Sequence, residues 1–274
     1  MTKKKPLTRE IIFKVLVNAL EPLDYVHAFY EGGAISHGRL DEWSDIDAYV
    51  VVDDGRVNEA FAIVEKALTS LSLIKQKYDV PQPGWPGVSR AFYRLENTSE
   101  YLLIDFCILN LSAPEKFLEP EMHGPAVFYF NKKGKIKISS LDKADFGKKI
   151  AARLERLQAR FEMFNCFVQK EINRGNSIEA LDLYHNLTLG LLVEALRIKH
   201  NPIHYDFKTH YVRYELPPKV VERLRHLYFA KDEKDLQQKY REASKWFQET
   251  MSTINKEKIT EQIGRSRPSA TANV

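Results

Sequence analysis

Short apolar stretches along the first half of the chain have the length and composition of β-strands. The segments "YVHAFYEG" (25–32) and "IDAYVVVD" (46–53) are rich in β-branched and aromatic residues. Similar stretches predict three more strands at about 73–79, 88–95 and 100–109. Two shorter stretches, at 125–130 and 135–138, flank "NKKGK", which reads as a turn.

Two other segments of the first half carry the helical period instead. Thr8 stands before residues 9–20 as a candidate N-cap, and Pro22 follows them as a stop signal. In residues 57–72, Val57, Phe61 and Val64 recur at spacings of four and three. The first half is therefore predicted to mix helices with strands.

From about residue 141 the pattern is helical throughout. Apolar residues recur at spacings of four and three and predict one long helix that ends at Gly175: Ile150, Leu154, Leu157, Phe161, Phe164 and Val168. Asn176 and Glu179 have the spacing of a capping box for the next helix. Three further helices are predicted at about 177–199, 218–230 and 233–257.

These patterns predict an α+β chain with two domains. Residues 1–140 form a domain built on a mixed sheet, and residues 141–258 form an all-helical bundle domain. Residues 259–274 end in "GRSRPSATANV", which is polar and has no period, so a disordered tail is predicted there.

Charge is distributed unevenly over the 274 residues. Residues 1–110 hold 12 basic and 16 acidic residues, a net charge of −4, and the remainder holds 29 and 21, a net charge of +8. An acidic half beside a basic half suits a site that holds a metal ion on one side and phosphates on the other. Ordinary solvated charge on helices explains the same counts equally well.

The sequence shows no segment that would place the protein in a membrane or export it. No apolar run is long enough to span a bilayer, and the basic start lacks a following apolar segment. Cys107 and Cys166 both lie in apolar patterns and are predicted to be buried thiols rather than a disulfide. A cytoplasmic protein is therefore expected.

Candidate chemistry begins in "EGGAISHGRLDEWSDIDAYVVVDD", residues 31–54. Asp45 and Asp47 are two residues apart at the start of a strand, so their side chains are expected to share a face. Two adjacent carboxylates repel each other unless a cation lies between them, and carboxylate oxygens suit Mg²⁺. The alternative is that they only cap the strand and its preceding turn.

The glycine pair before these acids suits an anionic ligand. Gly32 and Gly33 let the backbone turn sharply and approach a ligand closely. A short helix from about Ala34 would direct free N–H groups at an anion. Ser36 and Arg39 are candidate donors to phosphates, although Arg39 is equally compatible with a plain surface charge.

Asp105 is a third candidate acid, because it is the charged residue of the otherwise apolar strand "YLLIDFCILN". A buried strand seldom carries an unpaired carboxylate. If this strand lies beside the one with Asp45 and Asp47, three carboxylates converge as in a two-metal phosphoryl-transfer site. Asp105 is then also a candidate base for an attacking hydroxyl. The alternative is a buried salt bridge to an arginine.

Gly33, the spacer to Asp45-Ile46-Asp47, and the later Asp105 resemble the motif of the nucleotidyltransferase superfamily of DNA polymerase β. "DEWSDID" is similar to its bacterial branch of small-molecule adenylyltransferases, such as the kanamycin and lincosamide nucleotidyltransferases. The resemblance implies transfer of a nucleoside monophosphate from an NTP, usually ATP, to a hydroxyl, with release of pyrophosphate. It implies two Mg²⁺ ions held by Asp45, Asp47 and Asp105, and a triphosphate held by the turn at Gly33.

The acceptor expected from this resemblance is a small molecule, with an antibiotic as one candidate. Nucleic acid and membranes are not expected as partners, and a homodimer is compatible with the resemblance. The net charge of +8 after residue 110 argues against polycationic aminoglycosides. Ala34 stands where the motif usually has a serine. Two alternatives stay open: an enzyme of toxin–antitoxin type that modifies protein or RNA, and, because of Ala34, a catalytically weak nucleotide-binding protein.

The loop at 197–218 gathers histidine and tyrosine residues without the spacing of a zinc site. Its aromatic and basic residues fit an acceptor pocket, a base-stacking surface or ordinary packing. Arg197 and His204 also loosely resemble the Arg-spacer-His pattern of HEPN ribonucleases.

Overall fold

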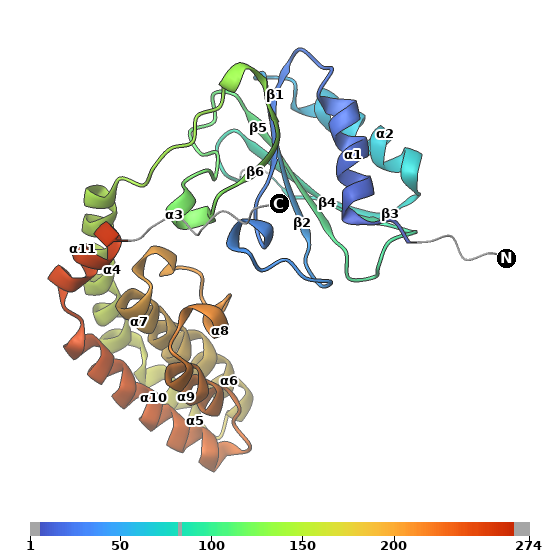
Figure 1. Cartoon of the computed structure of the whole chain (residues 1–274). Helices are drawn as coiled ribbons and strands as arrows, with labels where there is room; N and C mark the ends of the chain where they lie inside the picture. The colour runs from blue at the N-terminus through green and yellow to red at the C-terminus, as the bar shows by residue number, and fades with distance from the viewer. Residues whose placement is uncertain (1–5, 82–83, 266–274) are drawn as a thin grey trace. The chain divides into compact units, whose positions relative to one another are not determined.

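The computed structural model describes residues 6–81 and 84–265, and it divides into two compact units (Figure 1). The division falls between Leu141 and Asp142, after the part of the chain that contains the strands. The first unit contains all six strands of the described residues, and the second is built from helices. The α+β class with a mixed sheet followed by a helical region is confirmed.

The first unit is built on one six-stranded sheet in the order β3-β4-β5-β2-β1-β6. The strands are β1 (Val26–Glu31), β2 (Ile46–Val52), β3 (Ile74–Asp79), β4 (Val88–Leu95), β5 (Ile104–Asn110) and β6 (Val127–Asn131). Strands β2 and β5 pair in parallel at the centre, and the neighbouring pairs are antiparallel. Each strand overlaps one of the stretches that the hydrophobic pattern predicted, and β5 and β6 each extend one residue beyond it.

Helices α1 (Arg9–Leu20) and α2 (Val57–Leu71) cover one face of this sheet (Figure 1). Their apolar stripes pack on alternate residues of the central strands, including Ile46, Ala48 and Val50 of β2. This face forms the larger core. The intervening residues of β2 therefore point to the opposite face, which is where Asp47 lies.

The opposite face carries a smaller core and an aromatic row. Tyr30 of β1 and Tyr49 of β2 stack with ring centroids 5.3 Å apart, and Phe117 lies 5.7 Å from Tyr49. Phe117 precedes the short helix α3 (Pro120–His123). The predicted strand at 135–138 is absent, because the Asn131 side chain bonds the backbone N–H and C=O of Ile136 in place of a partner strand.

The second unit contains the following helices: α4 (Lys143–Phe164), α5 (Cys166–Arg174), α6 (Ser177–Leu183), α7 (Gly190–His200), α8 (Val212–Glu215), α9 (Pro218–Tyr228), α10 (Glu233–Thr253) and α11 (Lys256–Arg265). A π-helical segment, η3 (Tyr184–Leu189), joins α6 to α7. Phe161 of α4 stacks on Phe247 of α10 with centroids 3.8 Å apart, at the centre of the packing.

Two helix boundaries differ from the predicted ones. The predicted long helix breaks at buried Asn165, whose amide bonds Tyr240, Ser244 and Thr188. The predicted capping box at Asn176 is wrong, because that side chain donates to Glu171 instead of capping α6. In both cases a polar side chain takes a partner that lies outside its own helix.

The predicted disordered tail is wrong for residues 259–265, which belong to α11. Ile259 and Ile263 lie one helical turn apart, and both are buried. Residues 266–274 lie outside the described part of the chain.

Arg197 organises the loop that the sequence singled out for its histidines and tyrosines. Its fully buried guanidinium donates to Glu215 Oε2 at 2.7 Å and to the carbonyl oxygens of Lys208 and His210. His204 pairs with the other oxygen of Glu215 at 2.9 Å. An arginine enclosed in this way holds the loop in shape and presents no group to RNA, so the likeness to HEPN ribonucleases finds no support.

Cys107 is buried as predicted, whereas Cys166 is exposed, contrary to its prediction. Cys166 follows the break at Asn165 and is the first residue of α5. A search of the described helices for one long and apolar enough to cross a bilayer finds none.

Candidate functional site

Asp47 and Asp105 lie side by side on neighbouring strands. The parallel register of β2 and β5 pairs Asp47 directly with Asp105, on the face opposite to α1 and α2. Asp45 precedes β2 and is exposed, and its Oδ1 accepts a hydrogen bond from the Leu103 N–H at 3.3 Å. Residues that are far apart in sequence thus meet at the start of the central strand pair.

Asp105 is 5% exposed and is held by Arg90 of β4. Arg90 donates from Nε to Asp105 Oδ1 at 2.6 Å and from an η nitrogen to Oδ2, which is a bidentate ion pair. The arginine side chain is itself 46% exposed. The salt bridge considered as an alternative for Asp105 is therefore present, and it lies at the same place as the other two aspartates.

The carboxylates perturb one another. Burial, followed by the charges of Asp105 and Asp45, raises the pKa of Asp47 to about 6. Burial also raises the pKa of Asp45, which the hydrogen bond from Leu103 opposes. Burial is the largest cause of both shifts, and a cation between the groups would relieve the part that is due to repulsion.

The glycine turn fits closely over Asp47. Gly33 has φ +66°, and a Cβ at this position would lie 1.8 Å from Asp47 Oδ2. Gly32 donates its N–H to the Asp47 carbonyl oxygen at 3.0 Å. Only glycine allows this turn to lie directly against the carboxylate.

The helix expected after Ala34 is the three-residue 3-10 helix η1 (Ile35–His37). The short helix is therefore present as predicted, and the binding of an anion by its N–H groups stays a prediction. The half-buried Arg39 lies shortly after η1, and its backbone N–H donates a hydrogen bond to the Ala34 carbonyl oxygen at 2.9 Å.

Ser36 is 3% exposed, and its hydroxyl has no hydrogen-bond partner among the described residues. It lies against Gly124, where a Cβ would come within 2.3 Å of the Ser36 carbonyl oxygen. The hydroxyl is thus enclosed between two chain segments, and contact with a triphosphate would require this loop to open.

Ser36→Ala is expected to stabilise the protein by about 1 kcal/mol, because it removes a buried hydroxyl that makes no hydrogen bond. Nucleotide affinity is expected to stay unchanged. Thermal unfolding and equilibrium titration with ATP check the two parts. A variant that is less stable and also binds ATP more weakly would show that the hydroxyl has a polar partner when nucleotide is bound.

The donor set of the three aspartates fits a hard cation such as Mg²⁺, because all their ligand atoms are carboxylate oxygens. Among the described residues, the ligand atoms of the three aspartates do not all lie within 4.8 Å of one another. Asp105 accepts hydrogen bonds from Arg90, and Asp45 accepts one from the Leu103 N–H. The described chain brings another three possible ligands within 4.8 Å of one another: Glu115, Glu119 and His123. That half-buried group is separate from the aspartates.

Two arginines at this site were not selected from the sequence. Arg90 lies in "VSRAFYRL", where its alternation with apolar residues indicates a strand face but gives no partner. Arg9 donates to the carbonyl oxygen of Asp45. Arg9 is the first residue of α1, a position where the helix dipole favours acidic residues over basic ones. A basic residue at this position is unusual, and this is the sequence signal that could have identified Arg9.

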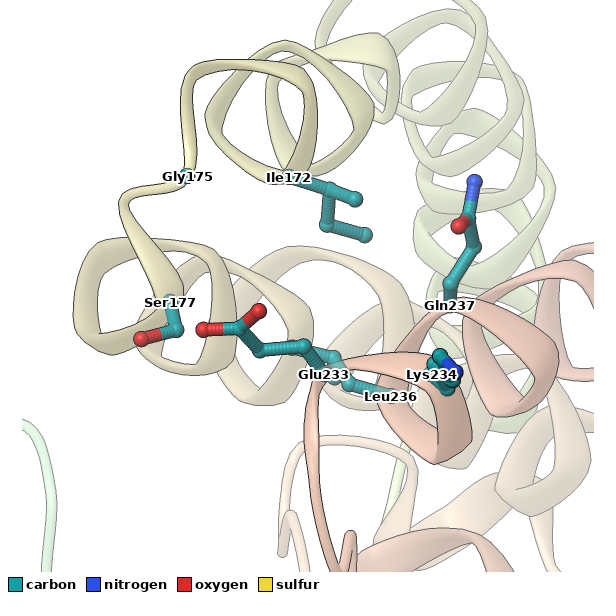
Figure 2. Close-up of a pocket in the computed structure, with 7 residues that line it drawn as sticks. All are labelled: Ile172, Gly175, Ser177, Glu233, Lys234, Leu236 and Gln237. Atoms are coloured by element: carbon teal, nitrogen blue, oxygen red, sulfur yellow. The ribbon is translucent and has the colours of Figure 1, made fainter.

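Each unit also has a pocket away from the aspartates. In the first unit, a cavity of about 720 Å³ on the α1 side is lined by residues that include Phe13, Leu40 and Tyr129. In the second, a cavity of about 200 Å³ is lined by residues that include Ile172 and Glu233, which Figure 2 labels. The smaller one contains none of the residues that the sequence analysis selected.

Comparison with known proteins gives structural neighbours but no sequence match. No protein-family model matches the chain, and a search of curated proteins finds no match either. The chain is similar to an aminoglycoside 6-adenyltransferase from Bacillus subtilis, with 12% identity, coverage of 95% of this chain and 100% of that chain, and a TM-score of 0.35. It is also similar to a spectinomycin adenyltransferase from Enterococcus faecialis, solved with ATP and spectinomycin, with 14% identity, 86% and 96% coverage, and a TM-score of 0.33. Both neighbours are named as adenyltransferases.

Proposed function

We propose that this protein is a nucleotidyltransferase that moves a nucleoside monophosphate, AMP from ATP, to a hydroxyl of a small molecule. The observation that carries the proposal is the direct pairing of Asp47 with Asp105 across β2 and β5, under the turn at Gly33. Carboxylates crowded in this way, with a raised pKa at Asp47, suit a cation-dependent reaction at phosphorus.

Each aspartate has a role in this proposal. Asp45 and Asp47 would hold Mg²⁺, and Asp105 would serve as a further ligand or as the base that receives the proton of the acceptor hydroxyl. When bound, Mg²⁺ would supply positive charge near the phosphates. The turn at Gly32 and Gly33 lets the triphosphate lie against the backbone, and Arg39 is its proposed side-chain contact.

The transfer balances with no further reactant. The acceptor oxygen forms a bond to the α-phosphorus while the bond from that phosphorus to the bridging oxygen breaks. Pyrophosphate leaves, and the hydroxyl proton passes to Asp105. Arg90 must then release at least one oxygen of Asp105. Its side chain is 46% exposed, so it has room to turn toward a phosphate.

The acceptor proposed is a hydroxyl-bearing small molecule, with antibiotics as the first class to test. The two structural neighbours are named for aminoglycosides and spectinomycin, which defines a practical starting panel. Neutral acceptors belong in the same panel, because the chain after residue 110 has a net charge of +8.

Pyrophosphate release from Mg-ATP is expected with at least one member of a panel of hydroxyl-bearing antibiotics and metabolites, and EDTA is expected to abolish it. A coupled pyrophosphate assay measures the release, and mass spectrometry identifies the adenylylated product. The protein with Asp24→Asn, a change at an exposed acid of the same unit, should behave like the unchanged protein.

Other outcomes of this assay would redirect the proposal. Transfer of label from ATP to protein or RNA in place of every small molecule would favour a macromolecular acceptor. Binding of Mg-ATP without pyrophosphate release would favour a nucleotide-binding protein, in line with Ala34 at the usual serine position.

A further inference from the structure

Arg9 connects the two chain segments that lead into the candidate site. Its guanidinium donates to the carbonyl oxygen of Ser44 at 3.4 Å and to that of Asp45. It also donates to Oε1 of Glu31, the residue directly before the glycine pair. One side chain at the start of α1 therefore fixes where the glycine turn begins and where the first aspartate stands.

The anchor of this arrangement is rigid. Glu31 is 1% exposed, and its second oxygen accepts a hydrogen bond from the Tyr129 hydroxyl at 2.8 Å. The Arg9 side chain is 13% exposed. The network joins α1, β1, β6 and the loop before β2, so the guanidinium has little freedom to move.

Stability alone does not account for this arginine. A buried ion pair is often no more stabilising than apolar residues of similar volume. A basic residue in the first turn of a helix also opposes the helix dipole. What the guanidinium gains is a pair of hydrogen bonds to the main chain at Ser44 and Asp45.

We propose that Arg9 is a positioning residue for nucleotidyl transfer, acting through the backbone of Asp45 and through Glu31 on the glycine turn. The inference rests on the proposed function, because it assumes that Asp45 and Asp47 hold a cation with the nucleotide. Residues that orient metal ligands from behind typically change metal affinity or activity by about 10-fold to 100-fold when they are replaced.

The main variant is Arg9→Met combined with Glu31→Gln. It removes both charges together, so that no unpaired charge stays buried, and it keeps the side-chain volume. Binding of Mn²⁺ in the presence of ATP, followed by electron paramagnetic resonance, is expected to weaken by about 10-fold to 100-fold while the melting temperature stays close to that of the unchanged protein. Lys14→Ala is the matched control, because Lys14 is an exposed basic residue of α1 that lines the same cavity.

A second measurement separates positioning from a general effect on folding. The cavity of about 720 Å³ is lined by Arg9, Glu31 and Tyr129, so a small ion can reach Glu31 from outside. In Arg9→Gly, added guanidinium is expected to restore part of the Mn²⁺ affinity, whereas ammonium at equal ionic strength is not. The planar fork of guanidinium can bond Glu31 and the Asp45 carbonyl oxygen together, which ammonium does poorly.

Should the double variant not fold, Arg9→Lys takes its place, with an intermediate loss of Mn²⁺ affinity expected. If the variant that folds binds Mn²⁺ within about twofold of the unchanged protein, the role of Arg9 is overturned and the proposed function stands, since a loss of about 10-fold or more is expected for the double variant and an intermediate loss for Arg9→Lys. If Asp47→Asn did not weaken Mn²⁺ binding either, the cation site itself would be wrong, and both proposals would fall together.

Discussion

Asp47→Asn is expected to abolish nucleotidyl transfer and, at neutral pH, to make the cation-free protein more resistant to unfolding. Loss of a central ligand removes several kcal/mol of transition-state stabilisation, or on the order of 10³-fold in rate. The gain in stability is expected because the Asp47 carboxylate is buried and lies near the charges of Asp105 and Asp45. Asparagine carries no charge and avoids both penalties. In its proposed role as a cation ligand, Asp47 is thus unfavourable for the fold alone.

The pH dependence follows from the direction of the pKa shift. The folded chain holds the Asp47 proton up to a pKa of about 6, above the ordinary value of 3.8. Folding therefore takes up a proton between these values, and this group lowers stability as the pH rises through that range, with the full loss above pH 6. Because Asp47 is only half-buried, the loss after solvent screening is on the order of 2 kcal/mol at pH 7.

Thermal unfolding at pH 5 and pH 7 in EDTA, for the unchanged protein and Asp47→Asn, measures this effect. The variant should have the higher melting temperature at pH 7, and the difference should shrink at pH 5. Saturating Mg-ATP should raise the melting temperature of the unchanged protein and leave that of the variant nearly unchanged. Equal melting temperatures for both proteins at pH 7 in EDTA would contradict the crowding of Asp47.

Gly33→Ala is expected to reduce transfer by on the order of 10²-fold, because small misplacements of reacting groups have effects of that size. The added methyl group would lie 1.8 Å from Asp47 Oδ2, so the carboxylate or the turn must move. The backbone at φ +66° adds a strain of about 1–2 kcal/mol for a residue with a Cβ. Activity and stability should therefore both fall.

Gly38→Ala separates these two causes. Gly38 has nearly the same backbone angle, φ +62°, but a Cβ there meets nothing within 4 Å. Its loss of stability should be about 1–2 kcal/mol, the strain alone, and its transfer rate should change little. Steady-state kinetics and urea unfolding of the two variants provide the comparison. Equal loss of activity in both would show that strain, and not the contact with Asp47, explains the effect.

The sheet and the aspartates could be predicted because each depends on local sequence. Strand segments carry their own composition, and the spacing of Asp45 and Asp47 predicts a shared strand face, although Asp45 lies just before the start of β2. Asp105 was detectable as a charge in an apolar run. That β2 and β5 are neighbours with Asp47 opposite Asp105 depends on strand order and register, which no single segment encodes.

The partners of polar side chains were the part that the sequence could not supply. Asn165 interrupts a helix because Thr188, Tyr240 and Ser244 happen to surround it. Arg90 meets Asp105 only because β4 pairs with β5. Each of these contacts joins residues from different elements, so the hydrophobic periodicity within one element cannot predict them.

The parallel pairing of β2 with β5 also bears on how the protein folds. A β-hairpin joins strands that are a few residues apart, whereas α2, β3 and β4 lie between β2 and β5 in the chain. Closing this long loop costs more conformational entropy, so we expect the pairing to form late in folding. A slip of one residue would turn Asp105 to the opposite face of the sheet. Partly folded chains would therefore lack the aspartate cluster altogether, so catalytic competence should return on refolding together with the last cooperative step and not before it.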